Sequence, residues 1–341
     1  MIGSPPQHLD APRIAVIVPA YGVAHLVGEA LASLQRQTLT AWECVVVDDG
    51  APDDVASAVQ PFLADPRIRL LATNNQGVST ARNRAIHATK APLIALLDGD
   101  DLLRSAYLET TTALLDADTS LRLVTCNASL FGAIPHERRA IEQYQGKTDG
   151  LHGTLADVLD RSFSIYIGTT FRRADFDRIG GFDPAMAQSE DFDLWVRLLM
   201  LGGRARYVDQ ILGDYRVRPA SASANSAQML IGNIRVYEKA AVALPPDAPE
   251  QPLLTHLLTQ TRAALAFEHA IDRIITGDTH LGLAELRLHR DHVSGLVWAT
   301  CFILWRIAPW LAHPMLRWRR YTHSRGAMPP RLFRALRNPG P

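Results

Sequence analysis

Short apolar runs alternate with helical patterns along the first 126 residues of this 341-residue chain. Runs rich in β-branched residues predict strands at Ile14–Val18, Cys44–Val47, Ile68–Leu71, Leu93–Leu97 and Leu121–Cys126. Apolar residues at helical spacing predict helices at Ala24–Arg36, Asp54–Phe62, Val78–Thr89 and Ser105–Leu115. Because strands that alternate with helices are typical of βαβ units, the pattern predicts an α/β fold with a mostly parallel sheet flanked by helices.

Each of the first four predicted strands ends in polar residues. These ends are Pro19-Ala20-Tyr21, Asp48-Asp49-Gly50, Asn74-Asn75 and, after the fourth strand, Asp98-Gly99-Asp100-Asp101. In an open α/β sheet, ligands bind beyond the carboxyl ends of the strands. We therefore expect the four polar segments to meet at one ligand-binding edge.

The acidic segment from Asp98 to Asp101 is typical of a cation site. Hard divalent ions such as Mg²⁺ and Mn²⁺ prefer oxygen ligands, and they often bind through one or two carboxylates together with substrate phosphates. The alternative is a solvated acidic turn, since Asp-Gly is a common turn signal. The chain has no GxGxxG or GxxxxGK[ST] segment, which argues against a dinucleotide-binding enzyme and a P-loop NTPase. Carboxylates at Asp48 and Asp49 can accept hydrogen bonds from a base or a ribose, so the set favours a nucleotide-diphosphate ligand.

The polar strand ends, together with their flanking residues, resemble the family 2 glycosyltransferases in order and spacing. The matching segments are Val16–Tyr21, Val45–Gly50, Asn75–Ser79 with Ala81-Arg82-Asn83, and Leu97–Asp101. The resemblance covers about residues 13 to 220, and it implies a GT-A type, Rossmann-like fold and an inverting sugar transfer. One departure is Gly22, where the family usually has Asn.

The resemblance also implies roles for individual residues. Pro19, Tyr21, Asp48 and Asp49 are expected to line the nucleoside pocket, with Asn75, Gly77 and Arg82 near the donor. Asp98 is expected to face the ribose, and Asp100 is expected to ligate Mn²⁺ or Mg²⁺. Asp101 is left open between touching the metal and capping the next helix.

A second acidic segment follows a glycine turn. Gly180-Gly181-Phe182-Asp183 precedes Glu190-Asp191, and apolar residues at helical spacing after this pair predict a helix that begins there. Carboxylates are favoured at a helix N-terminus, so both residues could simply cap it. In the family that the chain resembles, the Asp of this pair is the general base, which implies that role for Asp191.

The segment Tyr215-Arg216-Val217-Arg218 is similar to the family's Tyr-Arg-x-His segment, with Arg218 in place of His. Because an arginine cannot ligate a cation, Arg218 either pairs with donor phosphates or lies in a solvated loop. The QxxRW signature of processive synthases is absent, which favours the addition of a single sugar.

The last third of the chain reads as helical. Apolar residues from Leu254 to Ile274 predict a helix that stops before Gly277, and a second helix is expected around His280–His289. The apolar stretch Val293–Trp305 is too short to span a bilayer, which needs about 20 residues.

Charge distinguishes the end of the chain from the rest of it. The formal net charge is zero, but residues 292–341 contain eight arginines and no Asp or Glu, so the first 291 residues carry the balancing −8. Tryptophans beside arginines indicate a segment that lies in the lipid headgroup layer. The alternative is a buried core helix with a basic end. The arginines could also bind nucleic acid, but no recognition motif supports that reading.

The combined interpretation divides the chain into four parts: residues 1–12, a flexible N-terminus; 13–223, a GT-A glycosyltransferase domain; 224–291, a helical extension; and 292–341, a membrane-associating tail. We expect an inverting enzyme that moves one sugar from a nucleotide-diphosphate donor to a saccharide or lipid-linked acceptor in cell-envelope glycan synthesis, with no nucleic-acid partner. The expected location is cytoplasmic, peripheral at the inner face of the plasma membrane. The alternatives are a nucleotidyltransferase acting on sugar phosphates and a non-catalytic sugar-nucleotide binding module.

Overall fold

The computed structural model describes residues 11–141, 150–166, 168–218, 226–290, 293 and 295–324. The chain forms two compact units. The first comprises residues 1–131 and 136–216, and the second comprises residues 132–135 and 217–341. The expected flexible N-terminus lies almost wholly outside the described residues, as do Pro219–Ser223 and everything after Ser324. The predicted boundaries at residues 12, 223 and 291 stay predictions.

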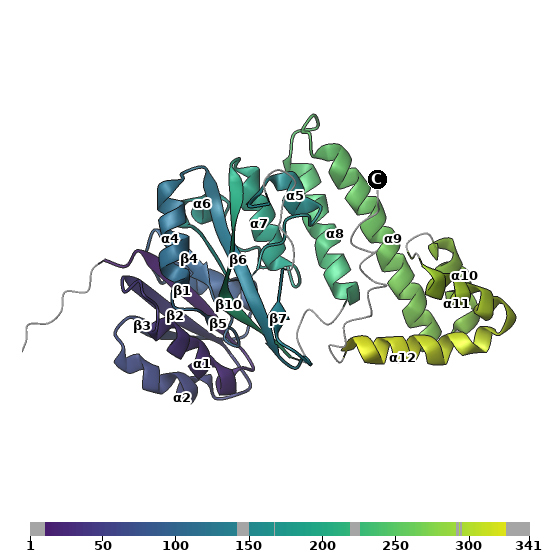
Figure 1. Ribbon diagram of the computed structural model, residues 1–341, viewed down its shortest axis with the longest axis horizontal. Coiled ribbons are helices and arrows are strands. Elements are labelled where there is room, and N and C mark those ends of the chain that lie inside the picture. The colour runs from purple at the N-terminus through teal and green to yellow at the C-terminus, as the bar shows by residue number, and fades with distance from the viewer. Residues whose placement is uncertain are drawn as a thin grey trace, which may run out of the picture. The chain divides into compact units, whose positions relative to one another are not determined.

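The first unit is built on a mixed sheet (Figure 1). The described strands follow the order β3-β2-β1-β4-β9-β6-β10-β5, with β7 beside β6 and β8 beside β10. Their bounds are β1 Ile14–Ala20, β2 Trp42–Asp49, β3 Ile68–Thr73, β4 Leu93–Leu96, β5 Leu102–Leu103, β6 Leu121–Gly132, β7 Arg138–Arg139, β8 His152–Gly153, β9 Thr169–Arg172 and β10 Arg204–Val217.

The α/β fold class and the parallel strands of the first half are confirmed. Strands β1, β2, β3 and β4 run parallel, and their ends are in register, with Ala20 opposite Asp48 and Asp49 opposite Thr73. The polar segments after these strands therefore begin at one edge of the sheet, as expected. Beyond β4 the sheet contains antiparallel pairs, including β9 with both β4 and β6, and β10 with both β5 and β8.

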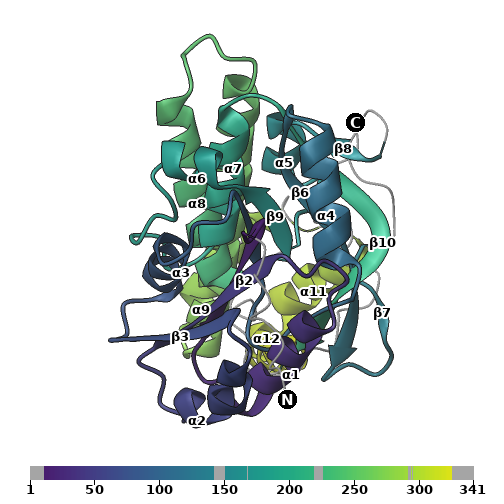
Figure 2. The ribbon, with the colours of Figure 1, turned by 90° about the vertical axis from the view of Figure 1, so that its left-hand side faces the viewer.

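Helices cover both faces of the sheet. The bounds are α1 Ala24–Gln35, α2 Val55–Val59, η1 Gln60–Ala64, α3 Val78–His87, α4 Tyr107–Ala117, α5 Leu155–Leu159, α6 Arg173–Arg178 and α7 Glu190–Met200. Alternate residues of β1 such as Val16 and Val18 pack in one core cluster with α1 and α4, whereas α3 contacts β1 and β2 from the other side. Figure 2 shows α3 to the left of β2 and β9 and α4 to their right.

Most of the predicted elements in the first half match the observed ones to within a few residues. One difference is the helix expected over Asp54–Phe62, which divides into α2 and the short 3₁₀ helix η1. Pro61 has no N–H with which to continue the α-helical hydrogen bonds, so the backbone tightens at that point. Strand β6 is also longer than expected, because it continues past Cys126 to Gly132.

The second unit is helical, as predicted. Its described helices are α8 Ser226–Ala243, α9 Gln251–Ile275, α10 Thr279–Leu288, α11 Leu296–Ile307, η4 Pro309–Leu311 and α12 Ala312–Ser324. Helix α9 ends just before Gly277, which adopts a positive φ of 114°, and α10 packs back on α9. A separate core gathers apolar residues of α9 to α12, including Phe267, Trp298 and Trp305. None of the described helices is long and apolar enough to cross a membrane.

Candidate functional site

The loop after β1 exposes Tyr21, one of the predicted site residues. Hydrogen bonds to Asp53, from the loop after β2, stabilise this loop. Tyr21 is 53% exposed, and Pro19 precedes it within the strand. Gly22 adopts a φ of +68°, a conformation that glycine takes without steric penalty. The Asp53 carboxylate accepts hydrogen bonds from the backbone N–H groups of Gly22 and Ala24 at 3.0 and 2.6 Å. Asp53 therefore caps the start of α1 from outside the helix.

The loops after β2 and β3 are tied together by Asp49. Its buried carboxylate accepts hydrogen bonds from the Thr73 hydroxyl at 3.0 Å, from the Gln76 N–H and from the Gly77 N–H at 2.8 Å. The structure thus places Asp49, Asn75 and Gly77 together, with Asp49 engaged by the protein's own donors. Their contact with a nucleoside stays a prediction.

Asp48 points into its own turn. Its Oδ1 accepts a hydrogen bond from the Ala51 N–H at 2.9 Å. Gly50, within this turn, has a φ of +63°, and a Cβ there would lie 2.7 Å from the backbone nitrogen of Asn75. Only glycine allows the two loops to approach so closely.

The acidic segment after β4 contains carboxylates in different environments. Asp98 is partly exposed, whereas Asp101 is buried and accepts hydrogen bonds from the Tyr166 hydroxyl and the Arg216 N–H. Burial raises the pKa of Asp101 to about 8, and the charge of Asp98 adds to the shift. Helix α4 begins only at Tyr107, so Asp101 does not cap it.

Arg216 of β10 fixes the backbone of the acidic segment. Its Nε donates to the Asp100 carbonyl oxygen at 2.9 Å, and its Nη2 pairs with Glu29 of α1 at 2.7 Å. The guanidinium also lies over the ring of Phe131. Neither Arg216 nor Tyr166 was proposed from the sequence as a site residue, although Arg216 lies within the Tyr215–Arg218 segment.

Arg82 connects the two acidic segments. This α3 side chain is 3% exposed, and its guanidinium pairs with Asp98 at 2.8 Å and with Glu190 at 2.9 Å. Burial alone would lower the pKa of Arg82, but Asp98 and Glu190 outweigh it and raise the pKa, so the group is a permanent cation. Arg82 therefore connects two parts of the expected site. One is the end of β4, which is expected to bind the donor, and the other is helix α7, which is expected to carry the base.

Glu190 and Asp191 begin α7, as predicted. Burial raises the pKa of Glu190, Arg82 opposes that shift and the neighbouring Asp191 adds to it. Asp191 is half-buried, and its Oδ1 accepts a hydrogen bond from the Phe192 N–H at 2.7 Å. Ser189, directly before the pair, adopts the left-handed region with a φ of +58°, a strained conformation for a residue other than glycine.

The Gly180-Gly181-Phe182 turn is held by Asn83, the neighbour of Arg82. The Asn83 side chain donates to the Phe182 carbonyl oxygen at 2.8 Å and accepts from the Phe182 N–H at 2.9 Å. Helix α3 thus contacts both acidic segments through Arg82, and it contacts the turn before α7 through Asn83. Asn83 was part of the recognised Ala81-Arg82-Asn83 segment, but its partner could not be read from the sequence.

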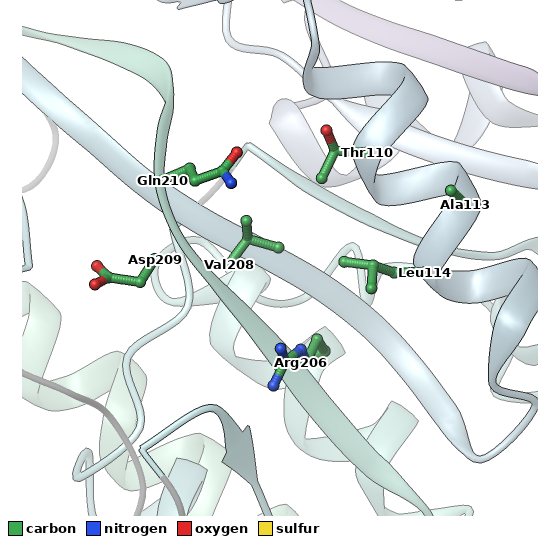
Figure 3. Close-up of a pocket in the computed structure, with 7 residues that line it drawn as sticks. All are labelled: Thr110, Ala113, Leu114, Arg206, Val208, Asp209 and Gln210. Carbon is green, nitrogen blue, oxygen red and sulfur yellow. The ribbon is translucent and has the colours of Figure 1, made fainter.

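Arg218 falls in the second unit, directly before the undescribed residues 219–225. Its predicted part in binding the donor therefore stays a prediction. A separate surface hollow of about 450 Å³ lies between α4 and β10 (Figure 3), lined by residues such as Thr110, Arg206 and Gln210. It contains none of the predicted site residues.

The donor set of the acidic segment suits a hard divalent cation. The described residues contain no cluster of three or more His, Cys, Asp or Glu side chains that could hold a metal by themselves. Asp100 is the residue expected to offer carboxylate oxygens, and Mg²⁺ or Mn²⁺ commonly binds through one or two such groups with the phosphates of a substrate. The residues present therefore fit a divalent cation that also takes oxygen ligands from a donor diphosphate.

Known proteins share both the sequence pattern and the fold. The sequence profile of the family Glycosyl transferase family 2 matches residues 15–180. An uncharacterised glycosyltransferase of Bacillus subtilis, EpsJ, is 38% identical over 219 residues, which is 62% of this chain and 62% of EpsJ. A second relative, the UDP-Glc:α-D-GlcNAc-diphosphoundecaprenol β-1,3-glucosyltransferase WfgD of Escherichia coli, is 26% identical over 65% of this chain and 84% of WfgD.

The solved structures include the mannosyltransferase PcManGT from Pyrobaculum calidifontis, in complex with GDP-Man and Mn²⁺. It is 19% identical, covers 92% of this chain and 85% of its own, and has a TM-score of 0.60. This likeness confirms the fold that the sequence resemblance implied. Residues 15–180 therefore carry the sequence pattern of the family 2 glycosyltransferases, and the fold is of the GT-A type.

Proposed function

We propose that this protein is an inverting glycosyltransferase that moves a single sugar from a nucleotide-diphosphate donor to a saccharide or lipid-linked acceptor in cell-envelope glycan synthesis. The observation that carries the proposal is the buried Arg82 bridge, which holds Asp98 at the strand edge and Glu190 beside Asp191 within hydrogen-bond distance of one guanidinium. A donor-binding carboxylate and the segment with the base are thereby fixed relative to one another. The match to the family's sequence profile supports the reaction type.

Asp191 is the proposed general base. In an inverting transfer, the acceptor hydroxyl attacks the anomeric carbon from the face opposite the leaving nucleoside diphosphate. The new C–O bond forms as the bond to the diphosphate oxygen breaks, and the hydroxyl proton goes to the base. A carboxylate within about 3 Å can accept that proton, as the base does for water in inverting glycosidases. Glu190 is less suited to the role, because Arg82 engages its carboxylate.

The leaving diphosphate gains negative charge during the reaction. A divalent cation bound by Asp100 together with the donor phosphates would supply Lewis-acid stabilisation there. The protein's own part is to hold the acidic segment in place, since Arg82 binds the Asp98 carboxylate and Arg216 binds the Asp100 carbonyl oxygen. The complex of PcManGT with Mn²⁺ supports a metal in a protein of the same fold.

The proposed setting rests on the relatives. WfgD is named for a UDP-glucose donor and a diphosphoundecaprenol-linked acceptor. Another relative, at 24% identity, is a putative teichuronic acid biosynthesis glycosyltransferase of Bacillus subtilis. The first name supports a lipid-linked acceptor for this chain, and the second supports a part in cell-envelope glycan synthesis.

The variant Asp191→Asn tests the proposal. We expect transfer to fall by about 10²- to 10⁴-fold, because the amide cannot accept the proton, while donor affinity stays within a factor of two to three. Transfer is measured by release of nucleoside diphosphate with Mn²⁺ present, and donor affinity by calorimetry. The control is Asp177→Asn, which removes an exposed carboxylate of α6 in the same unit and should leave both values unchanged. Equal loss of binding and transfer in Asp191→Asn would overturn the role of Asp191.

The product of the same assay separates the alternatives. Nucleoside diphosphate is expected from transfer, whereas pyrophosphate would indicate a nucleotidyltransferase. Binding without turnover, over a panel of donors and acceptors, would indicate a sugar-nucleotide binding module.

A further inference from the structure

Helix α11 carries apolar side chains on two opposite faces. Trp298 and Trp305 lie seven residues apart and point into the core of the second unit, where they are 7% and 1% exposed. Leu296, Ile303 and Ile307 follow each other at helical spacing and are 87%, 64% and 75% exposed. We call these three residues the α11 face. A surface helix of a water-facing protein normally has a polar outer side, so the α11 face is unusual.

Exposed tryptophans follow the helix. Trp310 in η4 is 69% exposed, and Trp318 in α12 is 70% exposed. Tryptophan combines a large apolar ring with an N–H donor, and it is enriched where a bilayer meets water. Their exposure contrasts with that of Trp298 and Trp305, which fill the core.

Positive charge accompanies the exposed apolar residues. Arg306 and Arg317 are exposed, and neither makes an ion pair among the described residues. Arg319 and Arg320 are instead paired with Glu268 of α9. In the sequence, residues 292–341 have no acidic side chain to offset the arginines.

We propose that the α11 face, together with Trp310, Trp318, Arg306 and Arg317, binds the surface of a bilayer that contains anionic phospholipids. The apolar side chains enter the headgroup and acyl boundary, and the arginines pair with lipid phosphates. A second copy of the chain fits less well, because a twofold contact through this face would bring like charges together. In this proposal the helix lies along the interface, because the α11 face runs along one side of it.

Vesicle sedimentation of the full chain tests this proposal. We expect the protein to sediment with vesicles of phosphatidylcholine containing about a third phosphatidylglycerol, and much less with pure phosphatidylcholine. The double variant Ile303→Gln/Ile307→Gln should bind the anionic vesicles at least about tenfold more weakly, because it removes apolar contact from already exposed positions. The matched control is Val242→Gln on α8, which changes a side chain that is 88% exposed and should not alter binding.

A second variant separates charge from apolar contact. Arg306→Gln/Arg317→Gln should weaken binding to anionic vesicles several-fold and reduce its salt dependence, with little effect on neutral vesicles. Thermal unfolding of each variant shows whether it is folded. No binding by the wild type, or equal binding by the double variant, would overturn the proposal. So would a wild-type dimer in sedimentation velocity that the double variant converts to monomers. None of these measurements requires turnover, so their outcome is independent of the proposed reaction.

Discussion

At the residue scale, the central feature is one buried cation shared by two carboxylates. Arg82 was expected near the donor, but its pairing with Glu190, 108 residues further along the chain, depends on how α3 and α7 meet. A motif gives the identity of a side chain and not its distant partner. The left-handed conformation of Ser189 was equally hidden, since serine is a poor sequence signal for that backbone region.

Removing the shared cation should destabilise the first unit strongly. Arg82→Met leaves Asp98 and Glu190 without their partner, and the loss of one member of a buried ion pair costs about 3–5 kcal/mol. The free energy of unfolding is measured with urea. The control is Arg84→Met on the same helix, which loses only a surface hydrogen bond to Gln76 and should change stability by less than about 0.5 kcal/mol. Similar values for the two variants would show that the bridge contributes little.

The sequence also does not reveal in which direction an acidic side chain points. Asp48, Asp49 and Asp101 were all identified from the sequence as members of acidic strand ends. In the structure, Asp49 binds the 73–77 loop and Asp101 binds Tyr166 and Arg216, so the protein's own donors engage both. The pattern predicts that acids gather at this edge, but the tertiary structure decides which of them face a ligand.

At the element scale, the alternation of strands and helices predicted the parallel half of the sheet well. Strands β1, β2 and β4 are short, largely apolar and mostly buried, which is the pattern that parallel strands produce, whereas β3 at the end of the strand order is mostly half-buried or exposed. The antiparallel half was harder to predict. Strand β10 combines charged residues such as Arg204 and Asp209 with buried ones such as Tyr207, and β9 has only four residues. Such strands are defined by their neighbours more than by their own composition.

The glycine turn before α7 offers a matched pair of substitutions. Gly180 and Gly181 both have a φ of +79°, but a Cβ at Gly181 would lie 2.8 Å from Asn83 Oδ1, whereas a Cβ at Gly180 would meet nothing within 4 Å. Gly180→Ala should therefore cost only backbone strain, about 1 kcal/mol. Gly181→Ala should cost about 1–3 kcal/mol more, because it also displaces the Asn83 contact. Thermal unfolding of the two variants measures the difference. Equal destabilisation would show that the close approach of Gly181 to Asn83 does not affect stability.

At the scale of the whole molecule, the expectation of a binding edge rests on several segments that are distant in sequence. The ends of β1, β2 and β3 are in register, which brings residues 20, 48, 49 and 73 to one edge. This convergence was predictable, because parallel strands of a sheet share their carboxyl side. The boundary between the two units was harder to predict from the sequence. It falls inside strand β10, which belongs to the first unit up to Arg216 and to the second from Val217.

Donor binding should be visible in the stability of the entire chain and should need a cation. With Mn²⁺ and a matching nucleotide sugar at about 100 times its Kd, we expect about 2.7 kcal/mol of added stability and a rise in Tm of roughly 4–6 °C. A chelator should abolish the shift. The shift in Tm is measured by thermal unfolding with a panel of UDP- and GDP-sugars, with and without Mn²⁺. A shift of equal size in the chelator would show that the donor binds without metal.

The acid that caps α1 explains why this fold must handle phosphate differently from a dinucleotide-binding enzyme. The free N–H groups at the start of the first helix are where such enzymes seat a pyrophosphate. Here the Asp53 carboxylate already occupies the Gly22 and Ala24 N–H groups. An incoming NAD or FAD would meet a negative charge in its usual cradle. The Asp53 carboxylate therefore disfavours a dinucleotide pyrophosphate at the start of α1.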